Sequence, residues 1–199
     1  EFETLEKISS TAEHALLLTL TLLRKTHISI PSVWDGYWDY KSFIGRQVNQ
    51  LSVGTVGLGR LGKMYAKMLK AMGADVYYFD PNKYDPNFKQ VDSLLELSSI
   101  VDVMAINCHA TPETTNIINQ EILAPKNLKY LINTARGEIV DQNAILSKLS
   151  ENSDFYYAAD VLDDEQVANA RYQFIRKLRK FKQNVVITPH QGGMTYDAR

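Results

Sequence analysis

The segment of residues 51–63, LSVGTVGLGRLGK, constrains the fold more than any other part of the sequence. Three of its glycines, Gly57, Gly59 and Gly62, follow an apolar run typical of a β-strand and precede residues with helical spacing. A glycine-rich turn of this kind binds phosphate groups, because it presents backbone N–H groups at the N-terminus of a helix. The segment fits two such patterns, the dinucleotide pattern G-x-G-x-x-G and the first seven positions of a P-loop, G-x-x-x-x-G-K.

The residue after Lys63 decides between the two patterns. A P-loop requires Ser or Thr there, because that hydroxyl binds the Mg²⁺ ion that bridges the phosphates, and this chain has Met64. In the dinucleotide pattern the first glycine allows the tight turn, the second lets the backbone approach a pyrophosphate, and the third lets the helix pack closely on the sheet. We therefore predict that five residues of this turn contact a dinucleotide: Gly57, Gly59, Arg60, Leu61 and Gly62.

Asp80 indicates which dinucleotide is bound. The second predicted strand, residues 74–80, ends at this aspartate, 18 residues after Gly62. A carboxylate at that position accepts hydrogen bonds from the adenosine ribose hydroxyls and repels a 2′-phosphate. We therefore predict that the cofactor is NAD rather than NADP, with Asp80 as one of its ligands.

The rest of the chain alternates apolar runs with short helical patterns. Strands are expected at residues 51–56, 74–80, 100–107, 128–135, 155–161 and 184–189. Helices are expected at residues 1–26, after the glycines (with Met64, Met68, Leu69 and Met72 in helical spacing), and at 91–99, 119–123 and 141–151, with an aromatic loop at 29–45. Such alternation predicts a Rossmann-type α/β fold, a doubly wound parallel sheet with helices on both faces.

Composition and charge exclude several classes of protein. The formal net charge of the 199 residues is −1, which gives no general attraction to nucleic acid or to an anionic membrane. The apolar run at 15–23 is shorter than the roughly 20 residues that a membrane span needs, and its basic residues follow it, unlike those of a signal peptide. The single cysteine, Cys108, cannot form an internal disulfide. We expect a soluble, cytoplasmic protein that binds neither nucleic acid nor membrane.

A basic block at residues 171–183 is the strongest local exception, with six bases and no acid. Phe174, Leu178 and Phe181 recur in it at helical spacing, so we interpret the block as a solvated helix with one packed stripe. No group of residues has the spacing of a metal site.

Ionisable residues follow the later strands of the predicted sheet. They are Arg136 in INTARGEIVD, Glu165 in AADVLDDEQ and His190 in VITPHQGG. Because ligands of open α/β sheets bind beyond the carboxyl ends of the strands, these three residues are candidates for the chemistry.

The chain resembles the nucleotide-binding domain of the D-isomer-specific 2-hydroxyacid dehydrogenases, the family of phosphoglycerate, glycerate and D-lactate dehydrogenases. The resemblance rests on the order and approximate spacing of TAEHALLLTLTLLRK, GLGRLG, TPETTNIIN, INTARGEIVD, AADV and NVVITPH, and it covers nearly the whole chain. It implies hydride transfer between NAD(H) and a 2-hydroxy acid/2-keto acid pair.

The resemblance also implies residue roles. Arg136 would bind the substrate carboxylate, His190 would exchange the proton of the substrate oxygen, and Glu165 would hydrogen-bond His190. A guanidinium fork matches a carboxylate, and a carboxylate beside an imidazole favours its protonated form. Asp160 matches the acid that holds the nicotinamide carboxamide, and we also assign three residues to the cofactor: Thr134, Ala135 and Gly192. Two features depart from the family, Gln166 in place of a proline and the basic block.

The resemblance implies a domain organisation. Residues 1–199 would form an NAD-binding domain, with a crossover helix at 1–26 and a Rossmann core at 46–199, whereas the substrate-binding domain is expected outside this chain. Relatives commonly dimerise through this domain, so a homodimer with an interface on residues 1–26 is expected.

Three alternatives remain open from the sequence. One is an NAD(H)-binding sensor or scaffold similar to transcriptional corepressors, without significant turnover. Another is a truncated gene product without function. A formate dehydrogenase fits less well, because the members that act on formate carry Gln at the position of Glu165.

Overall fold

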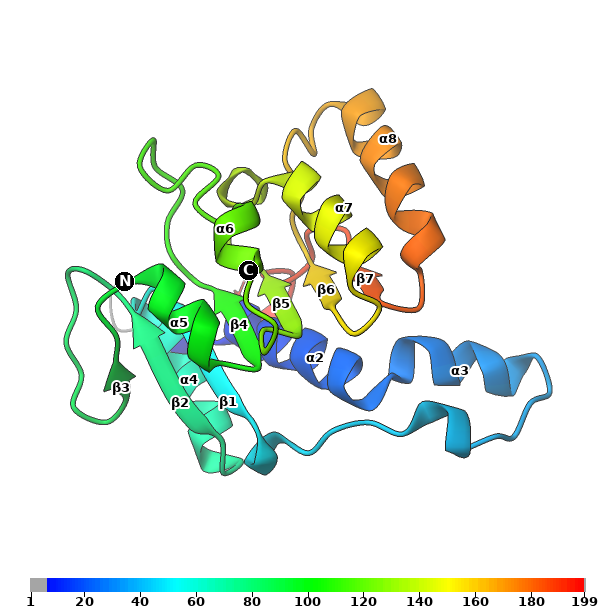
Figure 1. Ribbon diagram of the computed structural model, residues 1–199, viewed down its shortest axis with the longest axis horizontal. Helices are drawn as coiled ribbons and strands as arrows, with labels where there is room; N and C mark the ends of the chain where they lie inside the picture. Colours follow the sequence, from blue (N-terminus) through cyan, green and yellow to red (C-terminus); the bar gives the residue numbers. More distant parts are fainter. Residues whose placement is uncertain (1–6, 199) are drawn as a thin grey trace.

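The computed structural model describes residues 7–198 and contains a sheet of seven parallel strands (Figure 1). Their order across the sheet is β3-β2-β1-β4-β5-β6-β7. The strands are β1 (Ser52–Val56), β2 (Asp75–Phe79), β3 (Lys89–Gln90), β4 (Val103–Ile106), β5 (Tyr130–Asn133), β6 (Tyr156–Ala159) and β7 (Val185–Ile187). This arrangement confirms the predicted Rossmann-type α/β fold. The first strand, β1, lies inside the sheet, with β2 and β3 added on one side of it and β4 to β7 on the other. The strand order therefore reverses between β1 and β4, which is where such sheets bind ligands.

The register brings the carboxyl ends of the central strands to one edge. Val56, the last residue of β1, pairs with Phe79 on one side and with Ile106 on the other, and Ile106 pairs with Asn133. The segments that follow these strands therefore meet above the same edge of the sheet. The glycine-rich turn and the candidate residues Arg136 and His190 all lie on such segments.

The described part of the chain contains seven α-helices: α2 (Ser10–Arg24), α3 (Thr26–Trp34), α4 (Arg60–Ala71), α5 (Leu94–Ile100), α6 (Gln120–Leu123), α7 (Gln142–Glu151) and α8 (Ala168–Leu178). Short 3₁₀ helices are η1 (Lys41–Phe43), η2 (Val48–Gln50), η3 (Gly137–Ile139), η4 (Arg179–Phe181) and η5 (Tyr196–Ala198). Side-chain caps fix where three of the α-helices begin, because Ser93, Asn119 and Asp141 accept hydrogen bonds from the first N–H groups of α5, α6 and α7.

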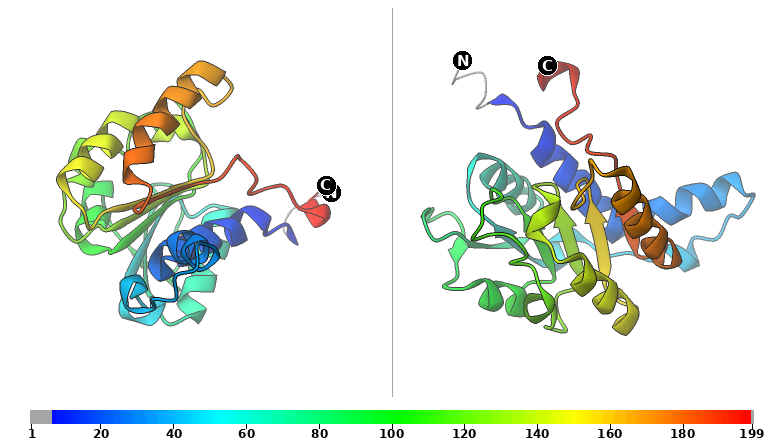
Figure 2. Two further views of the ribbon diagram at one scale, coloured as in Figure 1. Left: turned by 90° about the vertical axis from the view of Figure 1, so that its right-hand side faces the viewer. Right: turned by 90° about the horizontal axis from the view of Figure 1, so that it is seen from above.

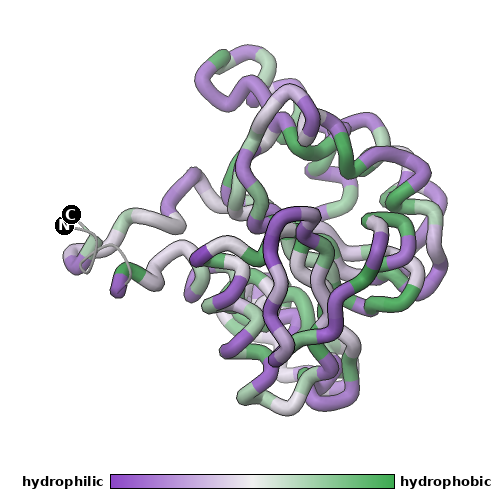
Figure 3. The backbone as a smooth tube through the Cα atoms, turned by 90° about the vertical axis from the view of Figure 1, so that its left-hand side faces the viewer, coloured by the Kyte–Doolittle hydropathy of each residue, from purple (hydrophilic) through white to green (hydrophobic). Residues whose placement is uncertain are grey.

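Helices cover both faces of the sheet (Figure 2). Each face buries its own apolar cluster. On one face, Met104 and Leu131 pack with side chains of α5, α6, α7 and α8. On the other face, Val103 and Ile132 pack with side chains of α2 and α4. Helices that cover a sheet need only one apolar side, and hydrophobic and hydrophilic residues alternate along them in Figure 3. The predicted packed stripe of the basic block is confirmed, because Phe174 and Leu178 of α8 are buried and Phe181 is partly buried.

Two expectations about local structure were wrong. Residues 29–45 were expected to form a loop, but the chain turns at Lys25, whose φ is 55°, and continues as helix α3 to Trp34. Pro31 lies inside this exposed helix and costs it one backbone hydrogen bond, which local sequence rules treat as a break. The two-residue edge strand β3 was also missed, because Lys89 and Gln90 are polar and too few to show an alternation.

The opening helix differs from its predicted extent. Residues 1–6 of the expected helix lie outside the described residues, and α2 ends at Arg24. Its start runs beside the segment that follows β7 (Figure 2), so that an added Cβ on Gly192 would lie 3.4 Å from Cδ2 of His14. Within residues 7–198, no helix combines the length and the apolar character that crossing a membrane would require.

Candidate active site

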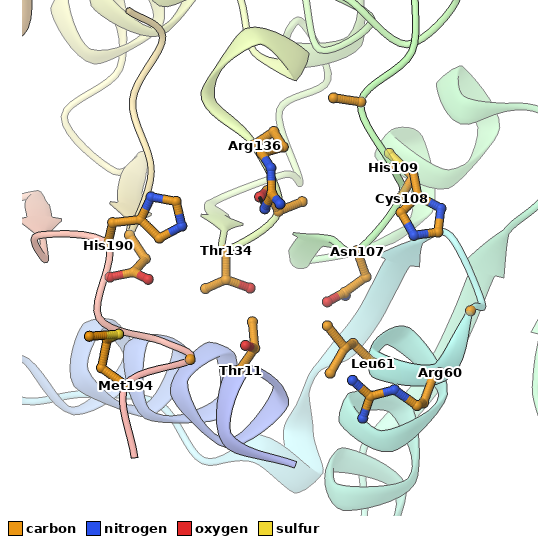
Figure 4. A pocket seen from close by; sticks show the side chains of 15 residues that line it. Thr11, Arg60, Leu61, Asn107, Cys108, His109, Thr134, Arg136, His190 and Met194 are labelled. Atoms are coloured by element: carbon orange, nitrogen blue, oxygen red, sulfur yellow. Dashed lines mark hydrogen bonds between the residues drawn. The ribbon is translucent and has the colours of Figure 1, made fainter. Parts of the chain in front are cut away.

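A cavity of about 620 Å³ lies above the carboxyl edge of the sheet. Figure 4 shows His190 and Met194 on one side of it and Arg60 and His109 on the other, with Thr134 between them. The lining residues are Thr11, Gly59, Arg60, Leu61, Asn107, Cys108, His109, Ala110, Thr134, Ala135, Arg136, Asp160, His190, Gly193 and Met194. The cavity thus extends from the glycine-rich turn to the ends of the later strands.

The three glycines of the turn have different steric surroundings. Gly57 has a φ of 91°, and a Cβ there would lie 2.8 Å from the backbone nitrogen of Cys108. A Cβ on Gly62 would lie 2.2 Å from the carbonyl oxygen of Gly57, so both positions exclude a side chain. Gly59 lines the cavity and has no heavy atom within 4 Å of an added Cβ. Open space therefore lies at the N-terminus of α4, where an anion is stabilised, and a pyrophosphate fits this space.

The structure also answers the question of the P-loop. Lys63 does not line the cavity, and its Nζ lies 2.6 Å from Oδ2 of Asp85. The ammonium of Lys63 and the N–H groups of Asn87 lower the pKa of the Asp85 carboxyl to about 2. The lysine is thus bound in an ion pair beside the sheet rather than directed at a phosphate, in agreement with the dinucleotide pattern.

Asp80 lies directly after β2 and contacts the glycine-rich turn. Its Oδ2 accepts a hydrogen bond from the backbone nitrogen of Leu58 (2.7 Å), and its Oδ1 accepts one from that of Asn82 (2.8 Å). The carboxylate is not among the groups that line the cavity. Arg60 lines the cavity, and its guanidinium donates a hydrogen bond to the carbonyl of Ile8.

A buried asparagine shapes the turn that carries Arg136. The side chain of Asn133, at the end of β5, accepts a hydrogen bond from the backbone nitrogen of Ala135 (3.0 Å) and donates one to the carbonyl of Arg136 (2.9 Å). These two bonds hold residues 133–136 in a compact turn, so that Thr134, Ala135 and Arg136 all reach the cavity wall. The sequence analysis did not single out Asn133.

Asp160, at the end of β6, is the most thoroughly bound acid of the site. It is 2% exposed, and it accepts hydrogen bonds from Oγ1 of Thr188 (2.6 Å) and from the backbone nitrogens of Gln191 (2.9 Å) and Gly192 (2.7 Å). Burial raises the pKa of Asp160, but these hydrogen bonds outweigh it and hold the pKa below its ordinary value. An ionised carboxylate therefore faces the cavity at neutral pH.

His190 and Glu165 form a pair at the same end of the cavity. Nδ1 of His190 is hydrogen-bonded to Oε1 of Glu165, and Oε2 of Glu165 accepts a hydrogen bond from the backbone nitrogen of Leu162 (3.1 Å). His190 adopts a left-handed backbone conformation (φ 54°), and its own N–H donates to the carbonyl of Asp160 (2.8 Å). The guanidinium of Arg171, in α8, donates a hydrogen bond to the backbone carbonyl of Glu165.

The lining holds several residues that the sequence analysis did not assign to the site. Thr11 of α2, Asn107 and Ala110 after β4, and Gly193 and Met194 after His190 all line the cavity. His109, which the sequence analysis did not assign to the site either, lines it as well. The rule that ligands lie beyond the strand ends applies to residues 107–110 as much as to Arg136, so this signal was present in the sequence.

Cys108 has no features of a reactive thiol. Burial raises the pKa of its thiol to about 11, so it is protonated at neutral pH. Among residues 7–198, no group of three or more His, Cys, Asp or Glu side chains is arranged to hold a metal ion.

The site can therefore hold an elongated anionic ligand. Its phosphates would lie at Gly59 and Arg60, and a reacting group would lie between Arg136 and His190 (Figure 4). A guanidinium and an imidazole on the wall of one cavity can bind a carboxylate and exchange a proton.

Comparisons with known proteins agree with this geometry. The family model described as D-isomer specific 2-hydroxyacid dehydrogenase, NAD binding domain, matches residues 16–192. A D-3-phosphoglycerate dehydrogenase of Synechocystis is 35% identical over 193 residues, which cover 94% of this chain and 34% of that protein. A glyoxylate reductase of Thermofilum pendens is 34% identical, over 92% of this chain and 54% of its own length.

Solved structures show the same similarity. The crystal structure of D-lactate dehydrogenase from Aquifex aeolicus, complexed with NAD and lactic acid, has a TM-score of 0.85 and 30% identity and covers 97% of this chain and 62% of that one. The chain thus spans about a third to three fifths of the length of these relatives. The matched family model covers most of the chain, and the cavity beside the glycine-rich turn agrees with it: this chain belongs to the D-isomer-specific 2-hydroxyacid dehydrogenase family, as an NAD-binding domain.

Proposed function

We propose that the protein containing this chain transfers a hydride between NAD(H) and a D-2-hydroxy acid/2-keto acid pair. The observation that carries the proposal is the hydrogen-bonded pair of His190 and Glu165, which lies with Arg136 around one end of the cavity. Bound NADH supplies the hydride in the reductive direction.

The three side chains have distinct roles in this proposal. Arg136 binds the carboxylate of the keto acid, which places the keto carbon beside the nicotinamide. Because Nδ1 of His190 is bound to Glu165, Nε2 is the nitrogen that gives its proton to the keto oxygen as the hydride arrives at the carbon. Glu165 stabilises the charged imidazolium before this transfer and holds the ring in place. In the oxidative direction the same Nε2 takes the hydroxyl proton.

The remaining residues hold the cofactor. The turn of Gly57, Gly59 and Gly62 places the pyrophosphate at the N-terminus of α4, with Arg60 and Leu61 beside it, and Asp80 binds the adenosine ribose. Thr134 and Ala135 support the nicotinamide half of the cofactor. Asp160 accepts a hydrogen bond from the carboxamide. Gly192 donates its backbone N–H to Oδ2 of Asp160 (2.7 Å), and a side chain is disfavoured there because a Cβ would lie 2.9 Å from the same oxygen.

Residues 1–199 form the NAD-binding domain in this proposal, and the substrate-binding domain belongs to the rest of the protein. The relatives named above differ in their substrates, since their names refer to phosphoglycerate, glyoxylate and lactate. We therefore assign a small 2-keto acid as the substrate class and leave its side chain open.

An exposed apolar arm supports the proposal of a homodimer. α3 and the segment after it project from the sheet (Figure 1) and expose large apolar side chains: Ile30, Val33, Trp34, Tyr37, Trp38, Tyr40 and Ile44. The buried face of α2, in contrast, packs on α4 and the sheet of its own chain. We therefore place the dimer interface on residues 26–44, in addition to the expected residues 1–26. A cytoplasmic location remains a proposal, supported by a single thiol that forms no internal disulfide.

The decisive experiment uses the full natural protein that contains this chain. NADH oxidation would be followed with a panel of 2-keto acids: hydroxypyruvate, glyoxylate, pyruvate and 2-ketoglutarate. We expect turnover with at least one of them, and its loss in a His190→Ala variant that still binds NADH. Tight NADH binding without turnover of any keto acid would instead favour an NAD(H) sensor or scaffold.

A further inference from the structure

A buried histidine of α2 contacts the acid that we assign to the nicotinamide. His14 is 8% exposed, and its Nε2 lies 2.9 Å from Oγ1 of Thr188 and 3.3 Å from Oδ1 of Asp160. The three residues come from α2, from the segment after β7 and from the end of β6, so only the folded chain brings them together. The mechanism above gives neither His14 nor Thr188 a role.

The chemistry of the three groups fixes the direction of the hydrogen bonds. Asp160 carries an ionised carboxylate, which can only accept hydrogen bonds. The hydroxyl of Thr188 therefore donates its one hydrogen to Oδ1 of Asp160 (2.6 Å). Toward His14, Oγ1 of Thr188 can then only accept. Nε2 of His14 must therefore carry a hydrogen and donate it, which orients the chain of bonds from His14 through Thr188 to Asp160.

These hydrogen bonds, which we call the relay of His14, Thr188 and Asp160, determine which carboxylate oxygen of Asp160 is left for a ligand. Oδ1 of Asp160 is surrounded by donors from Thr188, Gln191 and His14. Oδ2 accepts one hydrogen bond, from the backbone nitrogen of Gly192, and a carboxylate oxygen accepts two. Asp160 lines the cavity, so the remaining position of Oδ2 is the one available to a donor on the ligand.

We propose that His14 and Thr188 are positioning residues that hold Asp160 as an acceptor for one N–H of the cofactor carboxamide. The inference rests on the proposed function of Asp160 and extends it to two residues outside the ligand contacts. Asp160 also holds the segment that carries His190, because it accepts hydrogen bonds from the backbone nitrogens of Gln191 (2.9 Å) and Gly192 (2.7 Å). The nicotinamide end of the site is thereby bound to helix α2.

The test compares cofactors that differ only in the carboxamide, with the full natural protein. Affinities would be measured for NAD⁺, for 3-acetylpyridine adenine dinucleotide, in which a methyl ketone replaces the amide, and for ADP-ribose, which lacks the nicotinamide. We expect the wild-type protein to bind NAD⁺ about tenfold more tightly than the acetylpyridine analogue, the effect of one charge-assisted hydrogen bond.

Substitutions of the relay should remove this preference selectively. His14→Leu and Thr188→Val eliminate the donors, so we expect the ratio of the two affinities to fall to about one, while ADP-ribose binds as before. His14→Gln and Thr188→Ser keep an N–H and a hydroxyl and should preserve the ratio. Thr19→Val is the matched control, because Thr19 also makes buried hydrogen bonds from α2, to the carbonyl of Ala15 and the hydroxyl of Tyr65 (2.8 and 2.9 Å), away from the cavity.

Each outcome has a separate meaning. Variants that weaken NAD⁺ and the analogue equally would overturn the inference, as would a His14→Leu variant that keeps the preference. A wild-type protein without any preference would overturn the assignment of Asp160 as well. Absence of turnover with every keto acid would remove the proposed enzymatic function, yet the affinity ratios would still be measurable.

Discussion

Nδ1 of His190 is hydrogen-bonded to Oε1 of Glu165, although 25 residues separate them in the sequence. The pair is held from both sides: the backbone nitrogen of His190 donates to Asp160, and Arg171 binds the backbone carbonyl of Glu165. The imidazole therefore has one nitrogen committed to the carboxylate and one that can exchange a proton with a substrate. This division of roles is the basis of the first prediction.

Replacing Glu165 by Gln should lower kcat much more than the affinity for NADH. The amide is neutral, so it no longer stabilises the imidazolium, and we expect kcat to fall by roughly 10²- to 10³-fold. The measurement is steady-state turnover with the best keto acid together with NADH titration. Asp164→Asn is the control, because Asp164 is exposed in the same loop and Asn tolerates its left-handed conformation (φ 51°). Equal losses in both variants would contradict a specific role of Glu165.

Alanine at two glycines of the phosphate turn should separate folding from binding. Gly62→Ala places a methyl group 2.2 Å from the carbonyl of Gly57, so we expect stability to fall by about 1–3 kcal/mol together with a loss of NADH binding. Gly59→Ala meets no heavy atom within 4 Å, but its methyl group occupies the space of the pyrophosphate. It should weaken NADH binding by at least about tenfold and leave Tm unchanged. Thermal unfolding and NADH fluorescence would be compared, and unchanged NADH affinity in Gly59→Ala would contradict the placement of the phosphates.

Asp80→Asn should weaken the preference for NAD over NADP. The substitution removes the negative charge that repels a 2′-phosphate, and it leaves one oxygen to serve the two backbone N–H groups of Leu58 and Asn82. We expect the ratio of the dissociation constants of NADPH and NADH to fall by about tenfold. Asp75→Asn is the matched control, because it removes the same charge at the opposite end of β2. Equal changes in the two variants would show that Asp80 acts only through net charge.

Serine at Trp34 and Trp38 should convert the proposed dimer into a monomer. The two indoles are 85% and 87% exposed, and such exposure of large aromatic side chains marks an interaction surface. Sedimentation equilibrium of the full natural protein gives the oligomeric state. Tyr84→Ser serves as the control, because this residue is 77% exposed but lies on the loop after β2. A wild-type protein that sediments as a monomer would refute the dimer.

The strands of the fold were predictable because each needs mostly local information. β4 and β5 are buried on both faces, so residues 103–106 and 130–132 form continuous apolar runs. The failures occurred where tertiary contacts override local signals. β3 is an example, because its two residues pair with Tyr77 and Tyr78. α3 is a different case: this exposed helix continues through Pro31 although the sequence indicates a break, and we have no tertiary contact that explains it.

The residues of the candidate site fall into the same two groups, those with a local signal in the sequence and those without one. The strand-end ionisable residues and the family resemblance predict Arg136, Glu165 and His190 from the sequence. The residues that support the site carry no such signal: Asn133 shapes the turn of Arg136 through side-chain hydrogen bonds. Thr188 and His14 act through hydrogen bonds between distant segments. His14 in particular lies 146 residues before Asp160 in the sequence, and no periodicity connects them.

The ion pair of Lys63 and Asp85 should make stability depend on acid pH. Asp85 is 5% exposed, and Lys63, followed by the N–H groups of Asn87, lowers its pKa to about 2, below the ordinary value of about 3.9 for an unfolded chain. Its stabilising contribution is therefore fully present above about pH 4 and is lost as the pH falls toward 2. We expect Asp85→Asn to reduce the free energy of unfolding at neutral pH, and the difference from wild type to shrink below about pH 4, as measured by urea denaturation. Asp154→Asn, which breaks a more exposed pair with Lys129, should have little effect at any pH. A difference between wild type and Asp85→Asn that stays constant down to about pH 2 would show that the carboxylate charge is not what stabilises this corner of the sheet.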